Sequence, residues 1–133
     1  MLANAINRPV SPPPVIFLVI DFNAESRFLL VKTLRRKFPT ALIHETDVAE
    51  NALELTRDVN LTAIISHRTF DVEGVELVRQ LRAVDRDVPI VMVSGIDRGS
   101  GPIEAGANAF LHYDQWLRIG TMVETLVGIG SNN

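Results

Sequence analysis

The sequence predicts an α/β fold in which helices cover both faces of a five-stranded parallel sheet. Short apolar runs rich in β-branched residues alternate along the chain with longer segments whose apolar residues recur at helical spacing. Strands that alternate with helices form βαβ units, and their right-handed crossovers give a parallel sheet. The length of 133 residues fits a single domain.

The first strand is predicted at residues 15–20, where an uninterrupted apolar run is typical of a strand buried on both faces. Pro89 is tolerated because it stands at the first position of its strand. The other four predicted strands span residues 41–45, 61–65, 89–93 and 109–112.

Five helices are predicted between and after these strands. Asn23 and Asp47 are expected to cap the first two, because their side-chain oxygens can accept hydrogen bonds from free backbone N–H groups. The fourth helix is expected to have one or two turns, because the segment before it is rich in glycine and ends in a proline. The helices cover residues 24–38, the segment after Asp47 to about residue 58, and residues 74–84, 102–106 and 115–127.

The chain is predicted to have three parts. Residues 1–14 form a leader that ends in Ser-Pro-Pro-Pro and is expected to be a stiff, exposed tail. Residues 15–128 form the globular domain, and residues 129–133 form a C-terminal tail.

Composition excludes several classes of function. Hydrophobic residues make up 47% of the chain, which is enough for a core. The net charge is −3 and the basic residues form no long run, so no direct binding of nucleic acid is expected. The absence of cysteine excludes disulfides, thiolate catalysis and cysteine-based zinc sites. The longest apolar run, of six residues, is too short to span a membrane, and the N-terminus lacks a signal peptide. We therefore expect a cytoplasmic protein.

The carboxyl ends of the strands are the predicted site, because ligands of doubly wound sheets bind there. The residues at or just past those ends are Asp21, Phe22, Ser66, His67, Ser94, Gly95 and residues 112–114.

The chain resembles the receiver domains of bacterial response regulators over about residues 15–128. Residues 15–23 resemble the apolar strand that the family closes with two acids, and Glu73-Gly74 resembles the pair that opens its third helix, where the family usually has aspartate. Residues 89–95 are similar to the family's fourth strand, and residues 106–110 to its Gly-Ala-x-x-aromatic segment. The resemblance implies a flavodoxin-like, three-layer α/β/α fold with strand order 2-1-3-4-5 and, here, a shortened fourth helix.

In the family, two acids and an acceptor aspartate hold Mg²⁺, while a hydroxyl residue and a lysine contact the phosphoryl group. This sequence departs at three of those five positions, with Phe22 for the second acid, Ser66 for the acceptor and Tyr113 for the lysine. Asp21 and Ser94 keep their chemical types. Phe110 corresponds to the family's aromatic switch residue and is interpreted as core.

Phosphotransfer is expected to be lost. One carboxylate is a poor Mg²⁺ site, so Mg²⁺ binding is expected to be weak or absent, and the Phe22 ring is expected to occupy ligand space. A serine hydroxyl without a positioned base is a weak nucleophile, and Tyr113 is uncharged at pH 7. No catalytic residue, metal site or cofactor is expected. The remaining pocket is interpreted as a satisfied polar cluster, in which Asp21 accepts hydrogen bonds from Ser66, Ser94 or Tyr113.

An enzyme is the less favoured interpretation. Ser66 and His67 are adjacent and point to opposite faces of an extended chain, and no G-x-S-x-G elbow surrounds the serine. The three histidines lie on separate elements and are expected to be solvated or satisfied.

We therefore expect a signalling module of two-component (phosphorelay) type that is not phosphorylated and acts through protein–protein interaction. Its partner is expected to be a histidine kinase, an output domain, another regulator or a second copy of itself. Two alternatives stay open, namely a receiver phosphorylated by an unorthodox route and a small-molecule sensor that uses the altered pocket.

Overall fold

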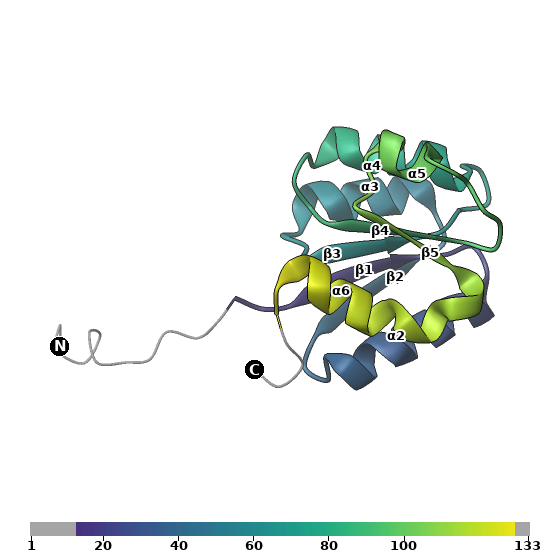
Figure 1. Cartoon of the computed structure of the whole chain (residues 1–133). Helices are drawn as coiled ribbons and strands as arrows, with labels where there is room; N and C mark the ends of the chain where they lie inside the picture. Colours follow the sequence, from purple (N-terminus) through teal and green to yellow (C-terminus); the bar gives the residue numbers. More distant parts are fainter. Residues whose placement is uncertain (1–12, 130–133) are drawn as a thin grey trace, which may run out of the picture.

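The structure, a computed structural model, describes residues 13–129. Most of the predicted leader and tail therefore lie outside the described residues. Five parallel strands form one sheet in the order β2-β1-β3-β4-β5, which confirms the predicted flavodoxin-like topology (Figure 1). The strands are β1 (Ile16–Ile20), β2 (Leu42–Thr46), β3 (Ala63–Ser66), β4 (Ile90–Ser94) and β5 (Ala109–His112).

Helices cover both faces of the sheet, as predicted (Figure 1). One face is covered by α2 (Ala24–Lys37) and α6 (Ile119–Val127), which pack against each other. The other face is covered by α3 (Ala49–Asp58), α4 (Gly74–Val84) and the short α5 (Gly101–Ala105). A 3₁₀ segment, η1 (Tyr113–Arg118), joins β5 to α6.

The sheet separates two apolar cores. Because side chains alternate along a strand, Phe17 and Val19 of β1 enter the core beneath α2 and α6, while Leu18 and Ile20 enter the core beneath α3 and α4. All four are fully buried. This burial on both faces explains why the central strands are continuous apolar runs.

Three of the predicted strands end one residue too early. Thr46, Ser66 and Ser94 are polar and were left out of the apolar runs, but each is paired in the ladder. Backbone pairing with the neighbouring strand, and not side-chain polarity, therefore sets where these strands end.

Helix starts were predicted with mixed success. Asn23 caps α2, and its Oδ1 accepts a hydrogen bond from Ser26 N at 2.9 Å. The predicted Asp47 cap is wrong, because Val48 occupies the N-cap position of α3 and its N–H donates to Thr46 Oγ1 at 3.1 Å.

The last helix begins later than predicted. Before it, His112 Nδ1 accepts a hydrogen bond from Asp114 N at 3.1 Å and opens the 3₁₀ segment η1. Gln115, the predicted first helical residue, has φ −112° and ψ 27°, which is not helical. The α-helix therefore starts at Ile119.

The fourth helix of the fold, α5, has five residues, as the glycine-rich segment before it predicted. Arg82 of α4 holds the turn that follows α5. Its Nε and Nη2 donate to Gly106 O at 3.0 and 2.7 Å, and Nη2 also donates to Asn108 Oδ1 at 2.9 Å. Its Nη1 donates to Val88 O at 2.7 Å. One planar guanidinium thus links α4, the loop before β4 and the turn before β5.

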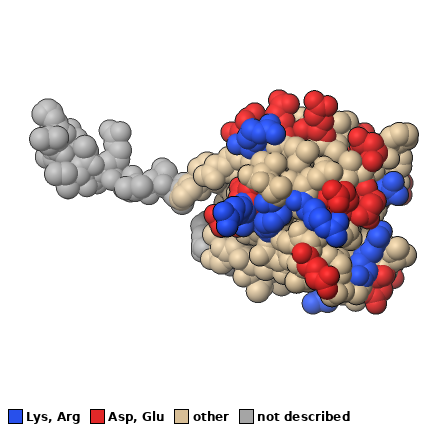
Figure 2. Space-filling view, turned by 90° about the horizontal axis from the view of Figure 1, so that it is seen from above, with Lys and Arg blue, Asp and Glu red and all other residues tan. Residues whose placement is uncertain are grey.

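The outer face formed by α3, α4 and α5 carries charges of both signs. Figure 2 shows a row of Lys and Arg side chains across this face, with acidic side chains on either side of the row. No broad surface of a single sign is seen in that view. In residues 13–129, no helix combines the length and the apolar character that crossing a bilayer requires.

The turn before β5 gives a first prediction. Gly106 has φ +117°, and a Cβ there would lie 2.8 Å from Arg82 Cγ. We expect Gly106→Ala to lower the free energy of unfolding by about 1–3 kcal/mol, measured by urea denaturation, because alanine is strained at positive φ. Gly95→Ala is the control, since a Cβ added at Gly95 would have no atom within 4 Å, and a change within about 0.5 kcal/mol is expected. Equal stability of Gly106→Ala and the native chain would contradict this account.

Candidate functional site

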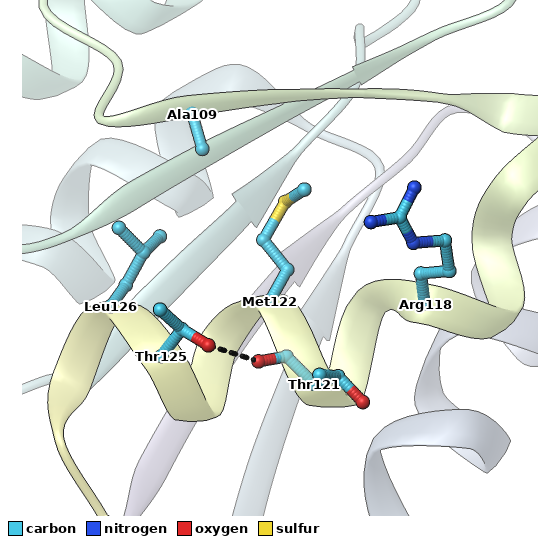
Figure 3. A pocket seen from close by; sticks show the side chains of 6 residues that line it. All are labelled: Ala109, Arg118, Thr121, Met122, Thr125 and Leu126. Atoms are coloured by element: carbon cyan, nitrogen blue, oxygen red, sulfur yellow. Dashed lines mark hydrogen bonds between the residues drawn. The ribbon is translucent and has the colours of Figure 1, made fainter.

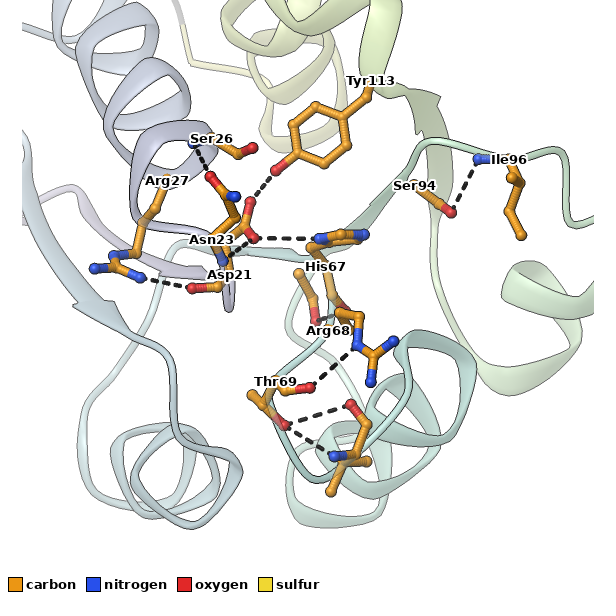
Figure 4. A network of polar contacts seen from close by, with 12 residues as sticks. Asp21, Asn23, Ser26, Arg27, His67, Arg68, Thr69, Ser94, Ile96 and Tyr113 are labelled. Carbon is orange, nitrogen blue, oxygen red and sulfur yellow. Dashed lines mark hydrogen bonds and ion pairs between the residues drawn. The ribbon is translucent and has the colours of Figure 1, made fainter.

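The carboxyl ends of the strands bring together polar side chains that are far apart in the sequence (Figure 4). Asp21 follows β1, His67 follows β3, Ser94 ends β4 and Tyr113 follows β5. Asp21 and Ser94 are buried, whereas His67 and Tyr113 are partly buried. The site lies where ligands bind in doubly wound sheets.

Asp21 is the centre of this site, and its side chain is fully buried. Its Oδ1 accepts hydrogen bonds from Asn23 N at 2.9 Å and from His67 Nδ1 at 3.2 Å. Its Oδ2 accepts a hydrogen bond from the Tyr113 hydroxyl. Arg27 Nη1 donates to the Asp21 backbone carbonyl at 2.6 Å and brings a positive charge near the carboxylate. A buried carboxylate is tolerated only with such partners.

His67 is a member of the site that sequence reasoning did not connect to Asp21. Because an ionised carboxylate only accepts hydrogen bonds, the ring hydrogen that faces Asp21 lies on Nδ1. The imidazole also packs edge-on against the Tyr113 ring, with centroids 5.1 Å apart and an interplanar angle of 84°. The partner is 46 residues away in the chain, so no local sequence pattern could show the pair.

The expected hydroxyl partners of Asp21 are only partly correct. Tyr113 contacts the carboxylate, whereas neither Ser66 nor Ser94 does. Ser66 Oγ is fully buried and donates a long hydrogen bond, 3.5 Å, to the carbonyl of His67. Ser94 Oγ instead accepts from Ile96 N at 3.3 Å, because the loop after β4 folds back over it.

Phe22 does not occupy the ligand space that the sequence suggested. Its side chain is 50% exposed, and its ring faces the Phe70 ring with centroids 6.0 Å apart. The backbone explains this orientation, since Phe22 N donates to Arg68 O at 2.8 Å. Phe110 is partly buried and packs against the core beneath α3 and α4.

The described part of the chain contains no group of three or more His, Asp or Glu side chains arranged to hold a metal ion. Every buried side-chain nitrogen and oxygen in residues 13–129 has a hydrogen-bond partner. The buried part of the site is therefore a polar cluster that satisfies its own hydrogen bonds.

A cavity of about 310 Å³ lies elsewhere, between β5 and α6 (Figure 3). Its lining contains one charged side chain, Arg118, which donates to Gln115 Oε1 at 2.6 Å. The Asp21 cluster does not line this cavity, so the two are separate features. The lining residues are Ala109, Arg118, Thr121, Met122, Thr125 and Leu126.

Solved structures similar to this chain include response regulators and receiver domains of histidine kinases. A two-component response regulator of the LuxR family from Aurantimonas matches with a TM-score of 0.77 and 18% identity, over 87% of this chain and 86% of that one. The receiver domain of a sensor histidine kinase from Pseudomonas aeruginosa, with magnesium in its active-site cleft, matches with a TM-score of 0.75 and 18% identity, over 88% of this chain and 100% of that one.

A third similar structure is the receiver domain of the histidine kinase CKI1 from Arabidopsis thaliana, complexed with Mg²⁺. It matches with a TM-score of 0.71 and 24% identity, over 84% of this chain and 91% of that one. No protein-family model and no curated protein matches the sequence. The comparisons show that this chain has the receiver fold.

The Tyr113–Asp21 hydrogen bond gives a second prediction. We expect Tyr113→Phe to lower the free energy of unfolding by about 1–3 kcal/mol, because a buried acceptor loses its donor. Urea denaturation measures the change. Thr125→Val is the control, since it removes an exposed hydroxyl that donates to Thr121 O, and it should change stability by less than about 0.5 kcal/mol. Equal effects of the two substitutions would show that Asp21 does not depend on Tyr113.

Proposed function

We propose that this chain is a signalling module of two-component type that is not phosphorylated, is not an enzyme and acts through contacts with another protein. The observation that carries the proposal is the use of Asp21. Both oxygens of this buried carboxylate already accept hydrogen bonds from Asn23, His67 and Tyr113. Through these hydrogen bonds the Asp21 carboxylate links the ends of β1, β3 and β5.

The site opposes Mg²⁺ binding on two grounds. Mg²⁺ requires several oxygen ligands in a near-octahedral arrangement and gives up water reluctantly. Phe22 and Ser66 supply no carboxylate, and a cation at Asp21 has to displace the hydrogen bond from Tyr113. Weak or absent Mg²⁺ binding is the proposal's direct consequence.

The site also lacks an activated nucleophile at the position of the family's acceptor. Ser66 Oγ is buried, and its single hydrogen bond among the described residues runs to the His67 carbonyl. Among those residues no side chain is placed to take its proton, and a serine hydroxyl without a base reacts slowly. These features favour a module that signals through its surface.

The similar structures support the two-component setting. They include a response regulator and receiver domains of histidine kinases, which are the protein classes that meet in this signalling. We infer from them a partner that is a histidine kinase, an output domain, another regulator or a second copy of this chain. Two rival functions are phosphorylation by an unorthodox route and small-molecule sensing. A mass measurement distinguishes the first of them from the proposal.

The third prediction concerns phosphorylation. After incubation with acetyl phosphate and Mg²⁺, intact-mass spectrometry is expected to show the unmodified chain, because the site lacks both the acceptor carboxylate and the cation site. A receiver domain with an intact acceptor aspartate, treated in parallel, serves as the positive control. A stoichiometric phosphoryl adduct on this chain would contradict the proposal.

The fourth prediction restores the missing groups. The triple variant Phe22→Asp, Ser66→Asp, Tyr113→Lys is expected to bind Mg²⁺ in calorimetric titration, because two carboxylates return beside Asp21 and the lysine replaces the tyrosine that bonds it. The matched control is Leu42→Asp, Asn60→Asp, Thr40→Lys, which places the same charges at the amino ends of strands, away from Asp21. Mg²⁺ binding by the native chain at this site, or equal gains in both variants, would contradict the explanation.

A further inference from the structure

The cavity between β5 and α6 lies at one edge of the sheet. Among residues 13–129, β5 pairs with β4 alone, so its outer side has no neighbouring strand. Ala109 begins β5, and Figure 3 shows its methyl group directed toward α6, where Met122 and Leu126 line the same cavity. All three residues are partly buried and pack against the core beneath α2 and α6. The volume of about 310 Å³ suits a small ligand, because ligand pockets usually measure about 300–1,000 Å³.

The polarity of the lining changes along the cavity. Arg118 is the N-cap residue of α6, whereas Leu126 lies in the last turn of that helix. Residues 118, 122 and 126 are spaced four apart, so their side chains lie along one face of the helix. Figure 3 shows all three directed toward β5. Since eight helical residues rise about 12 Å, the charged end and the apolar end of the cavity are about that far apart.

The charge of Arg118 is not balanced by an acid. Its Nη1 donates to Gln115 Oε1, a neutral acceptor, and the side chain has no ion pair within the described part of the chain. One hydrogen bond leaves further guanidinium N–H groups free to donate. The hydroxyl of Thr125 is already used, because it donates to Thr121 O at 3.0 Å. One end of the cavity therefore offers a planar cation, and the rest offers mainly apolar groups.

We propose that this cavity binds a monocarboxylate with an aliphatic chain, whose length of about eight carbons suits the distance of about 12 Å between its ends. A carboxylate accepts two parallel hydrogen bonds from a guanidinium, so the acid group fits the end at Arg118. The chain then lies along Met122 and Leu126 toward Ala109, where both it and the lining lose contact with water. This inference goes beyond the proposed function and does not depend on it, because the Asp21 cluster does not line this cavity.

The test is calorimetric titration of the whole chain with sodium octanoate, with sodium butyrate and with octylamine. Octanoate is expected to bind saturably to one site, with a Kd of about 1 mM or below. Butyrate should bind at least about tenfold more weakly, because four fewer CH₂ groups are buried. Octylamine has the same chain but the opposite charge, and it should also bind at least about tenfold more weakly. No saturation by octanoate at about 10 mM, or equal affinity for octanoate and either comparison compound, would overturn the proposal.

Variants locate the binding. Arg118→Gln is expected to weaken octanoate binding about tenfold and to abolish discrimination against octylamine, because it removes the charge but keeps a hydrogen-bond donor. Arg57→Gln is the matched control, since it removes the same charge in the last turn of α3, on the other face of the sheet, and should leave the affinity unchanged. Unchanged affinity in Arg118→Gln, or equal weakening in both variants, would contradict the proposal.

A second variant fills the apolar end. Ala109→Leu places a larger side chain between β5 and α6 and is expected to abolish octanoate binding, while circular dichroism checks that the variant is folded. Retained octanoate binding in folded Ala109→Leu would exclude this cavity as the site.

The other possible occupant of the cavity is a second copy of this chain. Thr125→Glu places a negative charge in the lining and is expected to leave the molecular mass in light scattering unchanged. A dimer of the native chain that this variant dissociates would show that a second copy covers the cavity, which would contradict the proposal.

Discussion

A buried carboxylate imposes the main constraint on this molecule. Asp21 is fully enclosed at the end of β1, and an ionised group in that position is stable only while several donors face it. Those donors come from the loop after β1, from the residue after β3 and from the residue after β5. The same interaction therefore satisfies a charge and joins three strand ends. Removing one donor leaves the others to compensate a charge that water cannot reach.

This arrangement changes the character of the site as a whole. With no acid at residues 22 and 66, Asp21 directs both carboxylate oxygens to protein donors, namely Asn23, His67 and Tyr113. A site that attracts cations needs clustered carboxylates, whereas the oxygens of Asp21 are engaged by hydrogen-bond donors of the protein. The receiver fold is retained, and the chemistry at its strand ends differs.

Much of the fold followed from the sequence because periodicity reports burial directly. The five strands and the shortness of α5 were predicted, since continuous apolar runs and a glycine-rich segment have few other interpretations, whereas the strand order followed from the resemblance to receiver domains. Features set by contacts between distant residues were missed. The Asp21–His67 pair is an example, and so is the 3₁₀ start after β5, which depends on the His112 side chain. Phe22 was placed wrongly because its orientation follows from a backbone hydrogen bond to Arg68.

Because α5 is short, the connection from β4 to β5 has few residues beyond the number that a crossover needs. The connection from β4 to β5 covers residues 95–108, which is 14 residues, and a crossover between parallel strands needs about a dozen. Deletions in this segment therefore cannot be absorbed without detaching β5 from the sheet edge, whereas insertions can extend outward as surface loops. In sequences descended from this one, the connection from β4 to β5 should therefore become longer but not shorter.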